Sequence, residues 1–373
     1  MPQKYDIMKL PTAISAIISA LAGIAAMHGQ PAAECGTGPA GNCREISGNG
    51  PQYAVVGLSV NFLREAPDYT AELGTQALMG DIVEIVDRNG YWCKVVTEEP
   101  YTAWCTDLGL VRMDAEGIGQ YRATPKYICT AWKSTVYSCP SMKSLKICDI
   151  VEGDILRQSG KTVTVRMDIE GKAPVTAMEI QRYRRPVTRH GFAEVILPDG
   201  KTGYVPRKDI MDYGKWKAEC SPTAENITAE AMKFIGVPYL WGGASPNGVD
   251  CSGLVRHVFR MNGILLPRNA SQQALCGSAV DIPELYPARE TTDGRNAAAR
   301  LFESLQPGDL LFFGARGQDG AGNSISHVGI YLGDGRIIHS SHYVRINSMI
   351  PGRPDYYDGA DRLLTVRRIL QTD

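Results

Sequence analysis

One cysteine lies where a polypeptide chain could use it as a nucleophile. Cys251 follows a glycine-rich loop, residues 239–250, and precedes apolar residues at helical spacing, namely Leu254, Val255, Val258 and Met261. The sequence therefore places Cys251 at a helix N-terminus, where unpaired N–H groups and the helix dipole favour negative charge. Such positions commonly lower the thiol pKa from about 8.5 and so favour the nucleophilic thiolate. We expect a thiol that ionises readily; a buried or disulfide-bonded cysteine is the alternative.

A base for this thiol is expected elsewhere in the chain, and two histidines are candidates. His327 begins an alternating apolar pattern typical of a half-buried strand, and His339 lies in the strand that returns after Gly333-Asp334-Gly335. A two-residue loop would place His342 opposite His327. A three-residue loop pairs Gly329 with His339 and puts His327 and His339 on one face. We favour the three-residue loop.

Four motifs carry a resemblance to a known family. They are Pro238-Tyr-Leu-Trp-Gly-Gly, Asp250-Cys-Ser-Gly, Leu305-Gln-Pro-Gly-Asp-Leu-Leu-Phe-Phe and Ser326-His-Val-Gly-Ile-Tyr. In this order, over residues 221–373, they resemble the NlpC family of papain-like cysteine peptidases, which cut bacterial peptidoglycan peptides. The resemblance implies that Cys251 is the nucleophile, His327 the base, and His339 the residue that orients His327.

A peptidase of this kind also needs donors for the oxyanion of its tetrahedral intermediate. The backbone N–H of Cys251, at the expected helix start, is one candidate. The family resemblance points to the Tyr239 hydroxyl as another. The alternative for Tyr239 is an aromatic residue of the core.

The segments before the cysteine are predicted to be β structure. Gly80-Asp-Ile-Val and the hairpin signal Asn89-Gly90 are echoed by Gly153-Asp-Ile-Leu and Asp199-Gly200, which makes a weak internal repeat with an insertion around residues 160–189. By resemblance, these units are two SH3-like barrels.

The expected fold class is therefore α+β, with a papain-like NlpC catalytic domain after two all-β SH3-like barrels. The expected domains are 51–115 and 116–215 for the barrels and 221–373 for the peptidase. We expect a linker at 215–224, a helix over 227–236, and a polar surface loop with a short helix at 277–300.

Within the family, the pattern is similar to γ-D-glutamyl-L-diamino acid endopeptidases, which carry two SH3-like domains and release L-Ala-γ-D-Glu from peptides with a free L-Ala amine. The resemblance suggests Asp250 for the substrate ammonium group, and Ser252 and Ser271 for the D-Glu α-carboxylate. It also suggests that Glu72 and Tyr101 of the first SH3-like domain close the amine end of the cleft. Asp250 and Ser271 could instead cap helices, and Glu72 could be a solvated surface residue.

Three other functions compete with this one. The chain could be a DL-endopeptidase acting on intact peptidoglycan, a non-catalytic wall-binding protein, or an acyltransferase on the same papain-like core. A strongly basic module surface would favour the intact wall. The chain has 39 basic and 40 acidic residues and a net charge of -1, which gives no electrostatic reason to expect nucleic acid or unspecific adhesion to an anionic polymer. We expect peptidoglycan-derived muropeptides as partners and a monomer.

The N-terminal residues are typical of an export signal. Lys4 and Lys9 precede an apolar stretch, residues 10–27, which Pro11 and Gly23 interrupt and which is short for a membrane span. We predict a signal peptide over 1–30, a linker over 31–50, and a periplasmic or secreted protein with no stable membrane span after cleavage. The alternative is a membrane anchor.

The chain has 10 cysteines, which fits an oxidising compartment. By spacing, Cys35 with Cys43 and Cys129 with Cys139 are plausible bridges, although connectivity does not follow from sequence alone. No Cys-x-x-Cys motif and no His/Cys/Asp cluster with zinc spacing is present. We therefore expect neither a metal nor a cofactor.

Overall fold

The structure, a computed structural model, describes residues 52–163, 191–282, 292–317 and 323–370. The predicted signal peptide, the following linker and the possible Cys35–Cys43 bridge lie outside these residues. Residues 49–373 form one compact unit. None of the described helices combines the length and the apolar character that crossing a membrane would require.

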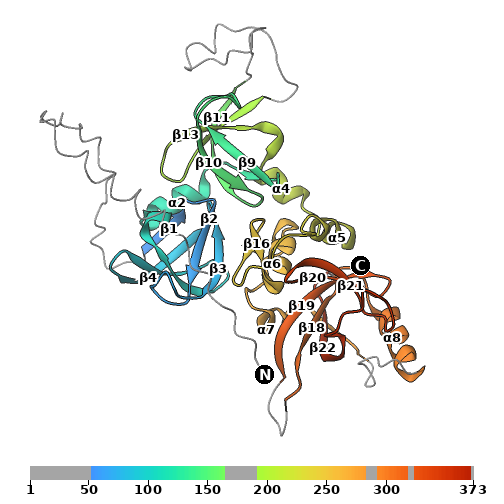
Figure 1. The fold of residues 1–373 in the computed structure, drawn as a ribbon. Coiled ribbons are helices and arrows are strands. Elements are labelled where there is room, and N and C mark those ends of the chain that lie inside the picture. The colour runs from blue at the N-terminus through green and yellow to red at the C-terminus, as the bar shows by residue number, and fades with distance from the viewer. Residues whose placement is uncertain (1–51, 164–190, 283–291, 318–322, 371–373) are drawn as a thin grey trace, which may run out of the picture. The chain divides into compact units, whose positions relative to one another are not determined.

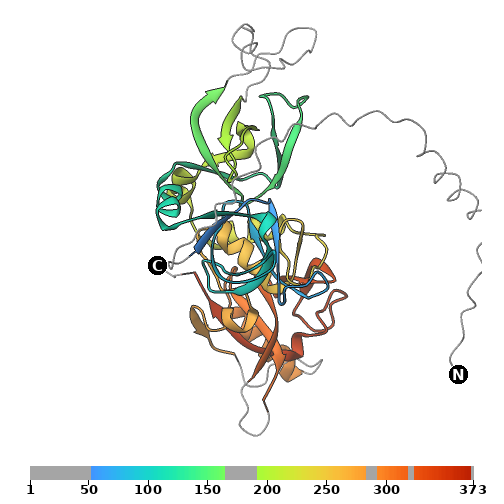
Figure 2. The ribbon, with the colours of Figure 1, turned by 90° about the vertical axis from the view of Figure 1, so that its left-hand side faces the viewer.

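Two seven-stranded antiparallel sheets precede the cysteine (Figures 1 and 2, blue to yellow-green). The first has the order β3-β2-β6-β5-β4-β1-β7 and the second the order β10-β9-β13-β12-β11-β8-β14. The strands of the first are Gln52–Val56, Val60–Arg64, Leu73–Leu78, Ile82–Asn89, Trp92–Val96, Thr102–Thr106 and Leu110–Met113 (β1 to β7). Those of the second are Lys126–Cys129, Lys133–Tyr137, Lys146–Val151, Ile155–Val163, Phe192–Ile196, Thr202–Pro206 and Ile210–Asp212 (β8 to β14).

The second sheet repeats the strand order of the first, strand for strand. Gly80 and Gly153, which the sequence repeat aligned, precede β4 and β11 and have φ values of +89° and +92°. Asn89-Gly90 turns β4 into β5, as predicted. At the corresponding place between β11 and β12 lies the predicted insertion, most of which is outside the described residues.

Two features of this region differ from the prediction. The strand ladder of each sheet ends at two edges, so the described strands form open sheets and not closed barrels. The region is also not all-β, because it contains α2 (Ala115–Ala123) and α4 (Tyr213–Glu219), which replaces the first half of the predicted linker. Both helices begin at an aspartate, Asp114 or Asp212, whose side chain accepts a backbone N–H. Such caps were overlooked because neither segment has a long apolar stripe.

The C-terminal part is built on a six-stranded antiparallel sheet of order β17-β22-β18-β19-β20-β21. Its strands are Ser278–Val280, Leu310–Ala315, Ser324–Gly333, Arg336–Ser341, Tyr343–Ser348 and Leu363–Arg368 (β17 to β22). A two-residue pair, β15 (Ala244–Ser245) and β16 (Gly248–Val249), precedes the cysteine helix. The helices are Ala224–Met232 (α5), Cys251–Met261 (α6), Ala270–Gln273 (α7) and Thr292–Ser304 (α8).

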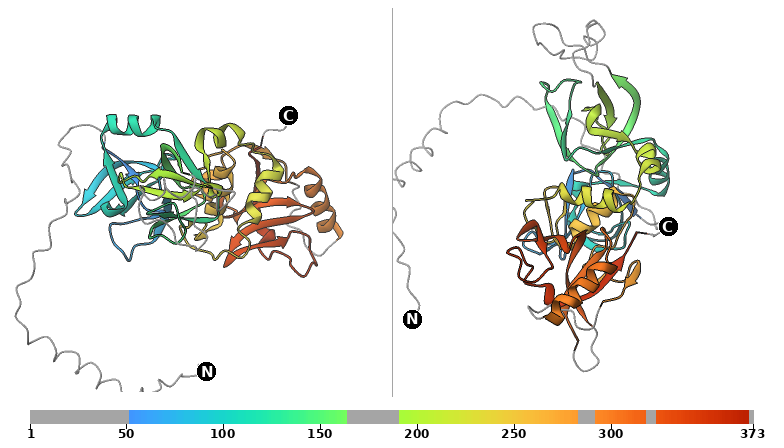
Figure 3. Two further views of the ribbon diagram at one scale, coloured as in Figure 1. Left: turned by 90° about the horizontal axis from the view of Figure 1, so that it is seen from above. Right: turned by 90° about the vertical axis from the view of Figure 1, so that its right-hand side faces the viewer.

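Side-chain alternation along β18 gives this sheet two buried faces. Leu310 and Phe312 belong to the core beneath α5, α6 and α7, whereas Leu311 and Phe313 belong to the core beneath α8. Figures 1 and 3 show α6 and α8 on opposite sides of the strands. The predicted surface loop at 277–300 is therefore wrong in part, because α8 buries Ala298 and Leu301, the latter inaccessible to solvent.

Candidate active site

Cys251 is the first residue of α6, as the sequence predicted. Asp250 caps this helix by accepting the Gly253 N–H at 2.7 Å, so the predicted capping role is confirmed. The helix start packs tightly against the preceding loop, since a Cβ at Gly253 would lie 1.9 Å from the Gly243 carbonyl oxygen. Glycine in the Asp-Cys-Ser-Gly motif therefore permits a close backbone approach that fixes the direction of the helix.

The histidine hairpin has the predicted pairing but reaches it by another route. Gly333 pairs with Arg336, so the loop has only two residues, Asp334 and Gly335, both with positive φ. A bulge between Tyr331 and Gly333 shifts the ladder by one residue. Ile330 then pairs with Ile338, and the same register sets Gly329 beside His339. His342 lies in the next turn, exposed and with a φ of 64°.

His327, His339 and Asn347 form a chain of hydrogen bonds. His327 Nε2 lies 2.8 Å from His339 Nδ1, and His339 Nε2 lies 2.9 Å from Asn347 Oδ1. The Asn347 amide in turn donates to the Asp355 carbonyl at 2.9 Å. The Tyr357 ring packs edge-on against His339 with centroids 4.7 Å apart.

The donors and acceptors in these hydrogen bonds follow from the position of the Asn347 amide. The amide N–H of Asn347 is engaged by Asp355, so its oxygen faces His339 and can only accept. His339 then carries its proton on Nε2 and accepts at Nδ1 from the Nε2–H of His327. The remaining nitrogen of His327, Nδ1, is left as the lone-pair site of a base.

Two hydrogen bonds hold the start of the cysteine helix close to His327 and His339. The backbone N–H of Val328, the residue after His327, donates to the Cys251 sulfur. The hydroxyl of Ser340, the residue after His339, donates to the Val249 carbonyl at 2.8 Å. Tyr239 is close enough to interact electrostatically with Cys251. Burial, followed by the charge that Cys251 carries when ionised, raises the pKa of the Tyr239 hydroxyl to about 12, which keeps it protonated and able to donate.

Burial reverses the expected ionisation of the thiol. Cys251 is 8% exposed, and desolvation, followed by the Asp250 carboxylate, raises its pKa to about 11 despite the helix start. Desolvation, followed by the charge of His339, lowers the pKa of His327 to about 3. The free site therefore holds a neutral thiol beside a neutral imidazole, and the expectation of a readily ionised thiol is wrong for this state.

The side chains of Asp250 and Ser252 both accept hydrogen bonds from Arg268. The Arg268 guanidinium donates to both oxygens of Asp250 and, at 2.9 Å, to the Ser252 hydroxyl. Asp250 also accepts from the N–H of Gly242 at 3.0 Å. Arg268 is only 4% exposed, and its charge offsets that of Asp250 inside the protein.

The first sheet contacts this part of the site through β3. Arg268 Nε donates to the Thr75 hydroxyl at 2.9 Å, and the Ala244 N–H donates to the Gln76 side chain at 2.9 Å. Gly242 has a φ of +75°, and a Cβ there would lie 2.1 Å from the Leu73 carbonyl oxygen. The loop before Cys251 therefore rests directly on a strand of the first sheet.

The predicted substrate residues at the amine end are arranged differently from the expectation. The Tyr101 hydroxyl donates to Glu65 at 2.5 Å, and charges of Arg268 and Asp250 act on it. Glu72 is exposed and contributes only its carbonyl, which accepts the Glu65 N–H. Glu65 is therefore the carboxylate that the structure brings to Tyr101.

Ser271 is exposed on α7, and Asn269 caps that helix instead. The alternative that Ser271 serves as a cap is thus wrong, whereas its role toward substrate stays a prediction.

Three residues of this arrangement were missed by the sequence reasoning. Arg268 belongs to Leu266-Pro-Arg-Asn, and an arginine between two apolar segments could have signalled a buried partner for Asp250. Glu65 and Asn347 carry no motif, because strand pairing alone brings them to Tyr101 and His339.

The disulfide expectation is not met in the described residues. Cys129 is buried and its thiol donates to the Ala131 carbonyl, and no bridge joins it to Cys139. Cys93 and Cys105 instead face each other across β5 and β6. Away from the cysteine helix start, a cavity of about 860 Å³ lies among both sheets and α6, and its lining includes none of the catalytic candidates.

Comparison with known proteins agrees with this geometry. The family described as NlpC/P60 matches residues 236–357, and the bacterial SH3 domain matches residues 57–108, within the first sheet. The gamma-D-glutamyl-L-lysine dipeptidyl-peptidase of Bacillus cereus is 28% identical over 305 residues, 79% of this chain and 76% of that protein. Dipeptidyl-peptidase 6 of Lysinibacillus sphaericus is 27% identical over 307 residues, 81% of this chain and 93% of that protein.

A solved structure of an NlpC/P60 family protein from Bacillus cereus is similar with a TM-score of 0.62 and 24% identity. The similarity covers 86% of this chain and 100% of that one, and it shows a shared fold. Together with the cysteine at the helix start and the two histidines on one face of a hairpin, these matches show a cysteine peptidase whose NlpC/P60 domain, residues 236–357, is preceded by a bacterial SH3 domain, residues 57–108.

Proposed function

We propose that this peptidase hydrolyses the γ-D-Glu–diamino acid bond of peptidoglycan stem peptides with a free N-terminal L-Ala, releasing L-Ala-γ-D-Glu. The observation that carries the proposal is the contact of the first sheet with the site: Thr75 holds Arg268, and Tyr101 and Glu65 lie within reach of the same charges. The Glu65 carboxylate, held by Tyr101, is suited to a substrate ammonium group. The names of the Bacillus cereus and Lysinibacillus sphaericus relatives support the same bond.

The arrangement of these residues supports a mechanism in which a thioester forms on Cys251 and is then hydrolysed. His327 Nδ1 takes the thiol proton as the Cys251 sulfur attacks the γ-carbonyl of D-Glu. The Cys251 N–H and the Tyr239 hydroxyl donate to the oxyanion that forms. The C–N bond breaks, and the leaving amine takes the proton from His327. A water molecule, deprotonated by the same nitrogen, then hydrolyses the thioester and restores the thiol.

His339 and Asn347 are positioning residues in this mechanism. They fix the tautomer that leaves Nδ1 of His327 without a proton. They also accept part of the positive charge when His327 becomes an imidazolium.

For recognition of the ammonium group we propose Glu65, with Tyr101, in place of Glu72. Asp250 already receives donors from Arg268, Gly242, Gly253 and Ser252, which fill the roughly four lone-pair sites of a carboxylate. Its role is then to hold the helix start and Arg268. The Tyr101 hydroxyl donates to Glu65 and leaves the other carboxylate oxygen for the substrate.

We further infer that the second sheet is a second SH3-like domain, because its strand order equals that of the first. We propose that the protein is exported and acts in the periplasm or outside the cell. The cell-wall substrates named for its relatives support this location.

The test is mass spectrometry of products from three substrates: free L-Ala-γ-D-Glu-diamino acid peptide, its N-acetylated form, and the peptide on intact glycan. We expect the dipeptide from the first only. A desolvated charge pair that loses one partner costs about 2–5 kcal/mol, so acetylation should slow cleavage by roughly 30-fold to several thousand-fold. Equal cleavage of free and acetylated peptides would refute the proposal and favour a DL-endopeptidase acting on intact wall.

A further inference from the structure

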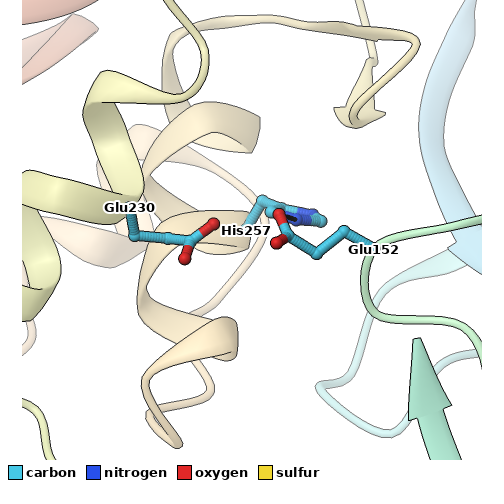
Figure 4. Close-up of side chains that lie close together, drawn as sticks. All are labelled: Glu152, Glu230 and His257. Carbon is cyan, nitrogen blue, oxygen red and sulfur yellow. Dashed lines mark ion pairs between the residues drawn. The ribbon is translucent and has the colours of Figure 1, made fainter. Parts of the chain in front are cut away.

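Three buried side chains from separate elements meet at α6, and none of them is among the catalytic candidates. Glu152 lies in the turn between β10 and β11, Glu230 on α5 and His257 on α6 (Figure 4). They are 1%, 9% and 1% exposed. Figure 4 shows the two carboxylates approaching each other from opposite sides, with the imidazole close to the carboxylate of Glu152. One ligand atom from each residue lies within 4.8 Å of the other two.

Each member of this cluster has a buried atom without a hydrogen-bond partner. Glu152 Oε2, Glu230 Oε1 and both ring nitrogens of His257 lack one. His257 Nε2 stands 3.5 Å from Glu152 Oε2, too far for a well-formed hydrogen bond. Buried polar atoms nearly always have a partner, so this concentration of unpaired atoms needs an explanation.

The other carboxylate oxygens of Glu152 and Glu230 both contact Lys233. Its ammonium lies 2.9 Å from Glu152 Oε1 and 2.6 Å from Glu230 Oε2. Each glutamate thus turns one oxygen to Lys233 and the other toward His257. Two carboxylates and one ammonium leave a net negative charge in a buried place, which a cation would neutralise.

We propose that Glu152 Oε2, Glu230 Oε1 and a ring nitrogen of His257 bind one divalent transition-metal ion, zinc or manganese. Imidazole and carboxylate oxygen are ligands of both ions, and a water molecule would complete a zinc tetrahedron. Burial lowers the pKa of His257 and keeps its ring neutral, which is the form that binds metals. Lys233 holds the outer oxygens, as groups next to metal ligands commonly do.

The proposed ion would reinforce the link that Lys233 already makes between Glu152 and Glu230, and it would add His257 of α6 to that link. It would tie the second sheet to α5 and α6, and His257 lies on the helix that begins at Cys251. The ion is therefore structural and takes no part in the peptidase reaction. Lys233, with its side chain 45% exposed, marks the side from which an ion could enter. Spacing along the chain does not indicate this site, because its ligands come from three separate elements.

The experiment uses the full-length protein after treatment with a chelator and dialysis. Manganese is added, and the free ion is measured by electron paramagnetic resonance; manganese is chosen because it avoids thiolates. We expect one tightly bound ion per chain and a higher melting temperature in its presence. Glu152→Gln and Glu230→Gln should each weaken binding at least tenfold, whereas Glu225→Gln, an exposed residue on the same α5, should not.

Two further measurements keep the test decisive. Peptide hydrolysis and circular dichroism at a temperature well below melting show whether each variant is folded, so a loss of ion binding in a folded variant supports the site. Cobalt should give weak visible bands without a thiolate charge-transfer band. No tight manganese site in the wild-type protein, unchanged binding in Glu152→Gln, or a strong thiolate band would overturn the proposal; the first result would point to a proton shared by the two carboxylates.

Discussion

The two seven-stranded sheets share one strand order, yet they contact the cysteine helix and its surroundings differently. The first uses β3, whose Thr75 and Gln76 contact Arg268 and the loop before Cys251. Its turns also place Asp81 and Glu99 in ion pairs with Arg260 and Arg256 of α6. The second uses the turn after β10, where Glu152 faces α5 and α6. A repeated architecture therefore does not imply a repeated role: only the first copy contacts the loop that leads to the nucleophile, and the second contacts α5 and the middle of the cysteine helix.

The two sheets are nevertheless tied to each other. Asp154, completely buried, accepts the Ser59 hydroxyl at 3.0 Å and the Met79 N–H at 3.0 Å. The Ile155 N–H donates to the Met79 carbonyl at 2.8 Å. Because both sheets also contact the catalytic part, a shift of one would strain the contacts of the other.

The largest effect should come from Cys251→Ala, which gives a baseline for comparing the sheets. Loss of the nucleophile should reduce kcat on the order of 10⁶-fold while the fold and peptide binding remain. Calorimetry would then measure the free energy of peptide binding to this inactive protein. The same measurement on inactive proteins with an added substitution in one sheet would give the contribution of that sheet to binding. Turnover that survives in the alanine variant would contradict the mechanism.

His339→Ala should lower kcat on the order of 10²–10⁴-fold, by analogy with other residues that orient a catalytic histidine. The loss should be the same for free and acetylated peptides, because His339 contacts neither sheet. His342→Ala, at an exposed turn, is the matched control and should leave activity near that of the wild type. The reverse pattern would mean that the hairpin register is wrong.

Asn347→Leu should reduce kcat by about 5- to 150-fold, since an unpaired buried donor on His339 costs roughly 1–3 kcal/mol. Asn347→Asp restores an acceptor for His339 and should recover part of the rate and displace the acid limb of the pH profile. A melting temperature measured alongside separates loss of orientation from loss of stability. Equal activity of the leucine and aspartate variants would show that the direction of the hydrogen-bond chain is unimportant.

Three glutamine variants compare the sheets directly. Glu65→Gln should raise KM for the free-amine peptide roughly tenfold or more, because a hydrogen bond to a charged group contributes about 1.5–3 kcal/mol. Glu72→Gln should change KM little, and Glu152→Gln should lower the melting temperature and leave KM unchanged. If Glu152→Gln altered KM as Glu65→Gln does, the division of roles between the sheets would be wrong.

The smallest effect concerns pH. With pKa values of about 11 for Cys251 and about 3 for His327, neither group of the free enzyme changes its protonation between roughly pH 4 and pH 10. His327 would be lost as a base only below this range, as it gains a proton. Alkylation of Cys251 by iodoacetamide should accordingly rise steadily from pH 7 to pH 10. A constant rate already reached near pH 6 would reveal a preformed thiolate–imidazolium pair.

The sequence was sufficient where function depends on local patterns. Helical spacing predicts Cys251 at the start of α6, and strand alternation predicts the shared face of His327 and His339. Both patterns can be recognised in a short stretch of sequence. Contacts between distant segments cannot be recognised in this way. Asn347 reaches His339 through strand pairing, and Glu65 reaches Tyr101 across a sheet.

The same limit explains why the ionisation expected for the thiol failed. The thiol pKa depends on burial, which no local spacing reveals. The search for metal ligands likewise considered only residues close in sequence and so did not include the cluster of Glu152, Glu230 and His257. Short helices such as α4 were missed because tertiary contacts, more than their own residues, stabilise segments of that length.

The bulge between Tyr331 and Gly333 decides which histidine lies beside His327. If all residues were kept but the bulge were lost, the two-residue turn would set the ladder by itself; His342 would then lie opposite His327, and His339 would turn to the other face. Deletion of the one extra residue of the bulge would instead leave Tyr331 opposite Ile337 and preserve the pairing of the two catalytic histidines. Relatives that lack the bulge should therefore be one residue shorter in this hairpin, a rule that aligned structures of relatives can examine without any enzyme assay.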